Sequence, residues 1–457
     1  MSAVTQHSTQ AVPVEFALPA GAASGCLAFD ADGEVTRARF AAQVRGLAAQ
    51  LPAGTHAVNL CEDRYRFLVA FCAVAMRGQV NLLPPNRTRA AIDEVRQQYP
   101  GSYCIGDGDA CGCLAGSDSG PHFVALPPQL PVLEGAPLRV EDAAVVAIGF
   151  TSGSTGQPTA NAKTMASFRV GTAQNLAALA SLWPAGAAVQ VVATVPPQHM
   201  YGIELSVLLP LLGDVAVHRG RPFFPDDIVR ALQSARAPRL LVTTPVHLRA
   251  LLESGVALPP LAGIVTATAP LSQELAAQAE ARFGCEVREA FGSTETCIFA
   301  FRRTARESAW TPCPGTRLQP RPDGTLVCAP HLAQPVQLAD LVELQEDGRF
   351  ILRGRQADLL EIAGKRASLA DLTRRLLAVP GVRDGAMFQL DTRAGGVRRI
   401  AAVFVSDTLD AAAVREALRA GVDPVFLPRP LRRVDSLPRN ETGKLPRSAL
   451  LALLQSH

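Results

Sequence analysis

One segment of the 457-residue chain combines hydroxyl side chains with glycines and follows directly after the apolar sequence AAVVAIGF. It reads Thr151-Ser152-Gly153-Ser154-Thr155-Gly156-Gln157-Pro158. Glycine lets the backbone approach an anion closely, and hydroxyl and amide groups donate hydrogen bonds to phosphate oxygens. A flexible Ser/Gly linker is the alternative, but linkers rarely lie flush against a buried strand. We interpret the segment as a phosphate-binding loop. It differs from the G-x-x-x-x-G-K-S/T loop because no Lys-Ser/Thr pair follows its second glycine.

Five other residues are candidates for chemistry on a nucleotide, although each one alone has an ordinary structural alternative. Glu295, beside a threonine, offers the hard oxygen that Mg²⁺ prefers, but an isolated glutamate is more often a solvated surface acid. Asp340 can accept hydrogen bonds from ribose hydroxyls and Arg355 can donate to ribose or phosphate, yet either can equally form a surface ion pair. Lys444 follows a Thr-Gly turn that presents a long cation. His199 is either a buried, hydrogen-bonded histidine or a gate beside a substrate channel.

Together these motifs resemble those of the adenylate-forming superfamily of acyl-CoA synthetases, non-ribosomal peptide adenylation domains and luciferases. They occur in the order typical of that superfamily, which makes a chance match improbable. In chain order they are TSGSTGQP from Thr151, PPQHMYG from Pro196, EAFGSTET from Glu289, the single residue Asp340, GRQAD from Gly354 and LPRNETGK from Leu437.

The resemblance implies an ATP site with ATP and Mg²⁺ as cofactors. When a carboxylate attacks the α-phosphate, negative charge grows on the phosphorus oxygens and the departing pyrophosphate, so cations and hydroxyls must converge there. Lys444, His199 and Glu295 are the implied catalytic residues, Glu295 is the implied metal ligand, and Asp358 is the implied hinge. The implied ATP contacts are Thr151, Ser152, Gly153, Ser154, Thr155, Gly156, Phe291 (stacked on adenine), Gly292, Thr294, Asp340 and Arg355.

The resemblance places the acyl pocket near His199, Thr266, Ala267 and Ala269. The segment 266–269 and the segment Val242–His247 mix small and polar side chains, which predicts a compact acid, either aryl or short acyl. The implied acceptor is the thiol of coenzyme A or of the phosphopantetheine arm of a separate acyl carrier protein, because no carrier domain follows the C-terminal motif. Arginine-rich segments near the C-terminus suit either acceptor.

Two other functions stay open at this point. One is adenylation without thioester formation, and the other is nucleotide binding without catalysis on the same fold. The joint presence of Glu295, Asp340, Arg355 and Lys444 favours a working acid–thiol ligase.

The chain departs from the superfamily pattern at two positions. Many relatives carry a lysine directly after the Gly-x-Pro of the phosphate loop, whereas this chain has Thr159. The next cation is Lys163, and we expect it to replace part of the missing charge. Asp371 stands where a glutamate is usual.

Apolar patterning predicts α/β layers that position these motifs. A helix is expected over 60–76 after an acidic start, and a strand over GQVNLL. Between 186 and 301, apolar strands alternate with helical stretches, as a layered parallel sheet requires. Residues 101–141 are rich in Gly, Ser and Pro and are expected to form a loop-like connection between lobes.

The expected fold class is α/β, with a large multi-lobed N-terminal domain of layered sheets and a small C-terminal α+β domain. Residues 1–357 are assigned to the N-terminal adenylation domain, which holds the ATP and acyl sites. Residues 358–457 are assigned to a small mobile domain that carries Lys444.

Composition excludes several classes of partner and location. With 44 basic and 41 acidic residues the net charge is only +3, so neither nucleic acid nor a membrane surface is an expected partner. The N-terminus lacks a charged head followed by an apolar stretch, and a cytoplasmic location is expected. The ten cysteines are expected to be free thiols. The closest group, Cys104, Cys111 and Cys113, lacks the paired spacing of a metal site.

Overall fold

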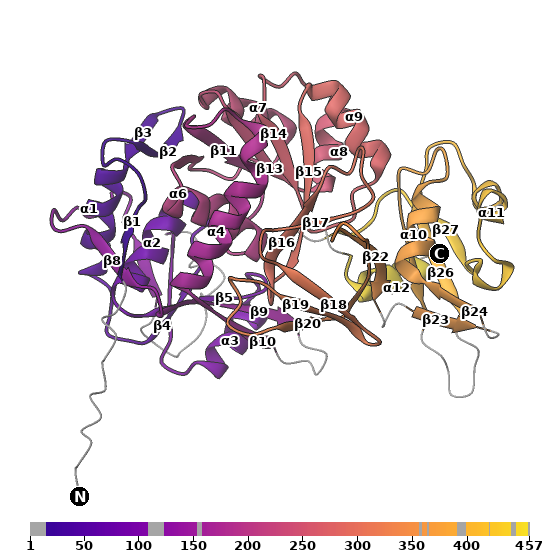
Figure 1. Ribbon diagram of the computed structural model, residues 1–457, viewed down its shortest axis with the longest axis horizontal. Coiled ribbons are helices and arrows are strands. Elements are labelled where there is room, and N and C mark those ends of the chain that lie inside the picture. Colours follow the sequence, from indigo (N-terminus) through magenta and orange to yellow (C-terminus); the bar gives the residue numbers. More distant parts are fainter. Residues whose placement is uncertain are drawn as a thin grey trace, which may run out of the picture. The chain divides into compact units, whose positions relative to one another are not determined.

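The computed structural model describes residues 15–107, 123–152, 158–355, 359–362, 365–390, 399–419, 421–439 and 445–455 (Figure 1). The chain divides into two compact units of two segments each. Unit 1 comprises Met1–Leu176 and Pro196–Arg221, and unit 2 comprises Ala177–Val195 and Pro222–His457. The predicted domain boundary at 357/358 falls inside unit 2 and stays a prediction. No helix among the described residues is long and apolar enough to span a bilayer.

Unit 1 contains a six-stranded sheet in the order β10-β9-β5-β4-β6-β7. Its neighbouring strands run parallel except for the antiparallel pair β9 and β10. A second group of strands in this unit has the order β12-β2-β3. The bounds are β2 Cys26–Asp30, β3 Gly33–Thr36, β4 His56–Asn59, β5 Val80–Leu83, β6 Tyr103–Asp107, β7 Phe123–Leu126, β9 Val145–Ser152, β10 Pro158–Thr164 and β12 Val215–His218.

Helix α2 (Arg64–Met76) packs against β4, β5 and β6. Asp63 caps its N-terminus by accepting a hydrogen bond from the Arg66 N–H at 2.8 Å. Nearly every residue of the helix is buried, which explains its continuous apolar sequence. The predicted helix over 60–76 is therefore confirmed, starting at the acidic cap. The other helices of this unit are α1 Arg37–Ala48, α3 Arg89–Gln98, α5 Met200–Ile203 and α6 Leu209–Leu212, with α4 Met165–Leu179 ending in the next segment.

The expectation that residues 101–141 form a loop-like connection is wrong for residues 103–107, 123–126 and 138–141, which form strands. The segment contributes β6 and β7 to the six-stranded sheet and β8 (Leu138–Glu141), which pairs antiparallel with β1 (Glu15–Leu18). These strands are short, and their pairing partners are distant in sequence. Local Gly and Pro content therefore does not predict them, because cross-strand packing decides whether such segments become strands.

Unit 2 contains six strands in the order β17-β16-β15-β14-β13-β11, of which β11, β13, β14 and β15 are parallel. This confirms the predicted alternation of strands and helices over 186–301. Figure 1 shows α7, α8 and α9 beside these strands. The bounds are β11 Val189–Ala193, α7 Pro225–Ser234, β13 Arg239–Thr243, α8 Pro245–Ser254, β14 Gly263–Thr266, α9 Gln273–Phe283, β15 Glu286–Ser293, β16 Cys297–Arg302 and β17 Thr311–Pro312.

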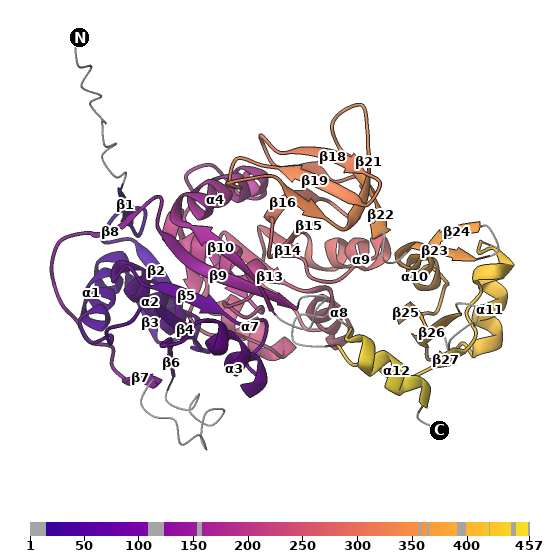
Figure 2. The ribbon, with the colours of Figure 1, turned by 90° about the horizontal axis from the view of Figure 1, so that it is seen from below.

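Smaller sheets follow along the chain in unit 2. Antiparallel strands β18-β19-β20 and the pair β21-β22 share a core around Trp310 and Phe350, two fully buried aromatic residues. Figure 2 shows β18, β19 and β21 grouped beside β16. The bounds are β18 Arg317–Arg321, β19 Gly324–Cys328, β20 Val336–Leu338, β21 Asp340–Leu344 and β22 Phe350–Arg355.

The described residues from 359 onward form an α+β arrangement with cores of their own, so the predicted fold class is confirmed. One core lies around Leu376 and Phe404, and a second lies around Val403 and Leu450. The elements are β23 Leu359–Ile362, β24 Lys365–Ser368, α10 Leu369–Leu377, β25 Asp384–Gln389, β26 Ile400–Val405, α11 Ala411–Arg419, β27 Leu431–Arg433 and α12 Arg447–Gln455.

Candidate functional site

The candidate metal ligand Glu295 lies in the tight turn between β15 and β16. Ser293 and Thr296 close this turn reciprocally: the Ser293 N–H donates to Thr296 Oγ1 at 3.0 Å, and the Thr296 N–H donates to Ser293 Oγ at 3.2 Å. A Cβ on Gly292 would lie 2.1 Å from the Cys297 carbonyl oxygen, so only glycine fits there. The half-buried Glu295 is therefore held on a preset backbone.

The ring of Phe291 is half buried and belongs to an aromatic cluster. Its centroid lies 5.3 Å from that of Phe299 and 5.1 Å from that of Trp310. Rings at these spacings stabilise one another, so the position of Phe291 is fixed before any ligand binds. Its stacking on adenine stays a prediction.

A row of polar side chains crosses four parallel strands, at the carboxyl ends of β11, β13 and β14 and in the middle of β15. Thr194 follows β11, and its Oγ1 lies 3.0 Å from that of Thr243 at the end of β13. Thr243 is the register partner of Thr266 on β14, and Thr266 is the register partner of Glu289 on β15. Registered neighbours in a parallel sheet share a face. The carboxyl edge of a parallel sheet is where α/β proteins bind ligands.

His247, at the start of α8, extends this row. Its Nδ1 lies 3.1 Å from Thr194 Oγ1 and 3.1 Å from Thr244 Oγ1. The edge of the Phe223 ring packs on the imidazole, with centroids 5.1 Å apart. The row thus joins hydroxyls from two strand ends, those of β11 and β13, to one imidazole. Thr194 was not predicted from the sequence. The feature that could have indicated it is its position as a hydroxyl residue directly after an apolar strand.

Asp340 and Arg355, two predicted ATP contacts, are brought together as register partners on β21 and β22. The backbone oxygen of Asp340 accepts a hydrogen bond from Thr325 Oγ1 at 2.6 Å, which fixes the start of β21. Asp340 is half buried. The hairpin therefore places Asp340 and Arg355 opposite each other on two neighbouring strands.

In unit 1, the predicted phosphate loop joins β9 to β10. Thr151 pairs with Thr159, and Ser152 pairs with Pro158, so the loop closes a β-hairpin. Residues Gly153, Ser154, Thr155 and Gly156 lie outside the described residues. A hairpin of this kind brings both ends of the loop to one point.

The geometry argues against Lys163 as a substitute for the loop lysine. Lys163 lies four residues beyond Thr159 on β10, roughly 13 Å along an extended strand. Its side chain is only 4% exposed. We therefore correct the expectation that this lysine supplies charge to the loop, because a buried side chain at that distance cannot reach the loop ends.

His199, the predicted gate, precedes α5 in unit 1 and is half buried. Its carbonyl oxygen accepts the Ile203 N–H at 2.7 Å, which starts the helix. A Cβ on Gly202 would lie 1.9 Å from the Pro196 carbonyl oxygen, so glycine lets the Pro-Pro turn fold back on the helix. A π-helical segment, Glu204–Leu208, follows, and such segments are frequent at functional sites.

Arg64 holds this π-helical segment in place through a hydrogen bond to Ser206. The fully buried guanidinium donates to Ser206 Oγ, which in turn donates to the Gly202 carbonyl oxygen at 2.6 Å. Burial, with the nearby charge of Arg221, lowers the pKa of Arg64 to about 9. The helix that starts at His199 is thus tied to the N-terminal part of unit 1.

Two predicted residues, Asp358 and Lys444, lie outside the described residues. The described part of the chain contains no group of three or more His, Cys, Asp or Glu side chains arranged as a metal site. Mg²⁺ keeps several waters and needs only one or two protein carboxylates beside substrate phosphates. Glu295 with the adjacent Thr294 fits that limited role.

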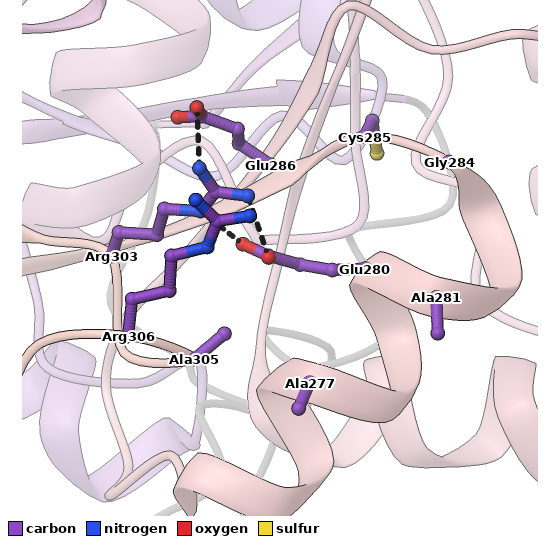
Figure 3. Close-up of a pocket in the computed structure, with 9 residues that line it drawn as sticks. All are labelled: Ala277, Glu280, Ala281, Gly284, Cys285, Glu286, Arg303, Ala305 and Arg306. Atoms are coloured by element: carbon purple, nitrogen blue, oxygen red, sulfur yellow. Dashed lines mark hydrogen bonds and ion pairs between the residues drawn. The ribbon is translucent and has the colours of Figure 1, made fainter.

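A hollow of about 490 Å³ lies at the other end of β15 (Figure 3). Arg303 forms ion pairs there with Glu280 and Glu286, both at 2.8 Å. Burial and the two glutamates raise the pKa of Cys285 to about 12, so its thiol stays protonated. Glu286 begins β15 and Ser293 ends it, which separates the hollow from the turn of Glu295 by roughly 23 Å. The hollow is therefore no part of the candidate site.

Comparison with known proteins shows which family and which fold the chain shares. A 4-coumarate–CoA ligase from Cereibacter sphaeroides is 29% identical over 265 residues, which cover 56% of this chain and 60% of that ligase. Solved structures that share the fold include those of MatB and of a benzoate CoA ligase. ATP-bound MatB from Rhodopseudomonas palustris has a TM-score of 0.80 at 19% identity, over 95% of this chain and 96% of that one.

A benzoate CoA ligase from Burkholderia xenovorans has a TM-score of 0.78 at 20% identity, over 94% of this chain and 96% of that one. The model of the AMP-binding enzyme family matches residues 20–326, which is more than half of the chain. The chain therefore belongs to the family of AMP-binding enzymes.

Proposed function

We propose that this protein is an acid–thiol ligase that uses ATP. In the first step a carboxylate oxygen attacks the α-phosphorus of ATP, forming an acyl-AMP as pyrophosphate leaves. In the second step a thiol sulfur attacks the acyl carbon, AMP leaves and the thiol proton passes to solvent. The products are a thioester, AMP and pyrophosphate.

One observation supports this proposal: Glu295, Asp340 and Arg355, which come from three separate motifs, all belong to unit 2. The turn with Glu295 and the threonine at the end of β14 lie at the carboxyl edge of one parallel sheet, and Asp340 is paired with Arg355. Ligands of open α/β sheets bind at this edge. Family membership supports the use of ATP.

Each of the predicted site residues has a role in the reaction. Glu295 would hold Mg²⁺, whose charge would offset that of the phosphates. Asp340 accepts hydrogen bonds from ribose, and Arg355 donates to ribose or phosphate. Lys444 stabilises the charge that concentrates when the carboxylate meets the α-phosphate. His199 controls the access of the acid and the thiol to the site.

The substrate that we propose is a compact carboxylic acid, aryl or short acyl. Support comes from the buried, short side chains at the ends of β13 and β14, where Thr243 and Thr266 are fully buried. The relatives named above include ligases of 4-coumarate and benzoate, which are compact aryl acids. The acceptor is coenzyme A or the phosphopantetheine arm of a separate carrier protein.

A screen of carboxylic acids scored by pyrophosphate release from ATP tests the proposal. We expect release that depends on both the acid and Mg²⁺, strongest with compact acids, and a thioester once thiol is added. Activity confined to acids of about twelve or more carbons would overturn the substrate assignment. Release of pyrophosphate with no acid at all, or none with any acid, would overturn the function.

A further inference from the structure

Two hydroxyls at the end of β14 have no hydrogen-bond partner among the described residues. Thr266 is fully buried, and its Oγ1 is unpaired although Thr243 and Glu289 flank it in register. The Oγ1 of Thr268, two residues on, is also shielded and unpaired. An unpaired polar atom in the interior destabilises a fold, so each such atom requires an explanation.

Thr268 also has an unfavourable backbone. Its φ is +81°, in the left-handed region that β-branched residues avoid. Glycine would adopt this conformation without strain. Strained residues of this kind gather at ligand sites, where the surrounding structure enforces them.

Contacts on the C-terminal side of Thr268 hold the segment that follows it. The Leu271 N–H donates to the Glu289 carboxylate at 3.3 Å, and Ser272 caps α9 by accepting the Leu275 N–H at 3.2 Å. Glu289 is itself fixed by Arg302 at 2.6 Å. The segment after β14 is therefore held at its C-terminal end, whereas the hydroxyls of Thr266 and Thr268 lack partners among the described residues.

The chemistry of the row indicates which group would supply the missing partner. Hydroxyls of Thr194, Thr243, Thr266 and Thr268 can donate and accept, and they carry no charge. The charge of Glu289 is balanced by that of Arg302, and Thr304 Oγ1 donates a hydrogen bond to its carboxylate at 2.6 Å. A second carboxylate or an ammonium group would need an opposite charge here, whereas a neutral hydroxyl matches.

We propose that Thr266 and Thr268 form a specificity subsite for a hydroxyl substituent on the acid, so that the substrate class is a compact hydroxy acid. This inference rests on the proposed adenylation of an acid. The hydroxyl of the substrate would supply the partner that the hydroxyls of Thr266 and Thr268 lack among the described residues. A site built around such a pair disfavours the analogue that lacks the group, since its own hydroxyls then stay buried and unpaired.

Matched acids test the subsite. Pyrophosphate release is measured with benzoate against 3- and 4-hydroxybenzoate, cinnamate against 4-hydroxycinnamate, and butanoate against 3-hydroxybutanoate. For at least one skeleton we expect kcat/KM to favour the hydroxylated acid by about tenfold or more. Thr268→Val should abolish that preference, and Thr268→Ser should keep it.

Two further variants separate specificity from folding. Thr268→Gly relieves the backbone strain, so it should raise or preserve Tm while losing the preference. Thr172→Val removes another buried, unpaired hydroxyl, on α4, and should leave the preference unchanged.

The outcomes distinguish this inference from the proposed function. No pyrophosphate release from the unaltered protein with any acid overturns the proposed function itself. Release with equal kcat/KM for plain and hydroxylated acids overturns the subsite alone. The subsite is also overturned if folded Thr268→Val, checked by its melting curve, keeps the full preference for the hydroxylated acid.

Discussion

Glu295 carries the most specific chemical assignment at the scale of single residues. Replacing it with glutamine keeps the shape of the turn but removes the charge that we assign to Mg²⁺ binding. We expect Glu295→Gln to raise the Mg²⁺ concentration for half-maximal pyrophosphate release by about tenfold or more, since even residues that only orient metal ligands contribute this much. Glu343→Gln, at an exposed glutamate paired with Arg353, is the control and should leave the Mg²⁺ titration unchanged. Identical titrations for the two variants would remove Glu295 from the metal site.

Gly202 tests whether the turn before α5 must fold back tightly. An added Cβ would meet the Pro196 carbonyl oxygen at 1.9 Å, so Gly202→Ala must displace the segment that ends at His199. We expect a loss of about 1–3 kcal/mol in the free energy of unfolding, measured by urea denaturation. Gly54→Ala is the control, because its Cβ would lie 3.6 Å from the Tyr103 ring, an ordinary contact. A stability equal to that of the control would show that the turn is loose.

The sequence predicts the role of a residue well when a motif specifies that role. It predicts the role poorly when the role depends on tertiary geometry. Asp340 and Arg355 were selected separately from the sequence, and the structure pairs them. The strain at Thr268 was not predictable, because threonine gives no sign of a positive φ. Lys163 was selected for its charge, but its burial depends on how β10 pairs with β9.

At the scale of elements, an ion-pair network joins α9, β15 and the segment after β16. Burial alone would raise the pKa of Glu280, but hydrogen bonds from Arg303 and the Val287 N–H, with the charge of Arg303, outweigh it and lower the pKa. A carboxylate with a lowered folded-state pKa stabilises the fold above its unfolded-state pKa. This stabilisation is lost as the pH falls through the folded-state value.

We therefore expect Glu280→Gln to cost about 1–3 kcal/mol of unfolding free energy at pH 7, as for hydrogen bonds to a charged group. The difference from the unaltered protein should shrink as the pH falls below the ordinary glutamate pKa. Urea denaturation at several pH values measures it. Because the hollow is remote from the candidate site, pyrophosphate release by the folded variant should be unchanged. A difference that does not vary with pH would contradict the ion-pair account.

Elements with strong local patterns were predictable. Helix α2, which begins after Asp63, and the apolar strands β13 and β14 lie where the sequence predicts them. Strands β6, β7 and β8 were not predicted, since four or five residues among glycines and prolines become a strand only through distant partners.

At the scale of the whole molecule, we predict that the region carrying Lys444 contributes to adenylation far more than to thioester formation. We expect Lys444→Ala to lower the rate of adenylation by about two to three orders of magnitude, as for a lost transition-state charge contact. Thioester formation from supplied acyl-AMP should fall far less, because that step does not join two anions. Both half-reactions are assayed on one preparation. Equal losses would show that Lys444 supports a static site or the fold.

The architecture was predictable as a class because strand–helix alternation fixes α/β layering. The predicted boundary at 357/358 marks a change in composition, whereas the two compact units are assembled from segments far apart in the chain. Residues 177–195 join unit 2 because β11 pairs with β13. No composition change in the sequence marks that exchange.

The central claim is that a carboxylate oxygen of the substrate attacks the α-phosphorus of ATP. An acid labelled with ¹⁸O in its carboxylate, incubated with ATP, Mg²⁺ and a thiol acceptor, tests this most directly. After one turnover, mass spectrometry of the recovered AMP should show one ¹⁸O atom, because the bridging oxygen stays on phosphorus when the thiol attacks the acyl carbon. Unlabelled AMP, or label recovered in inorganic phosphate beside ADP, would contradict the account.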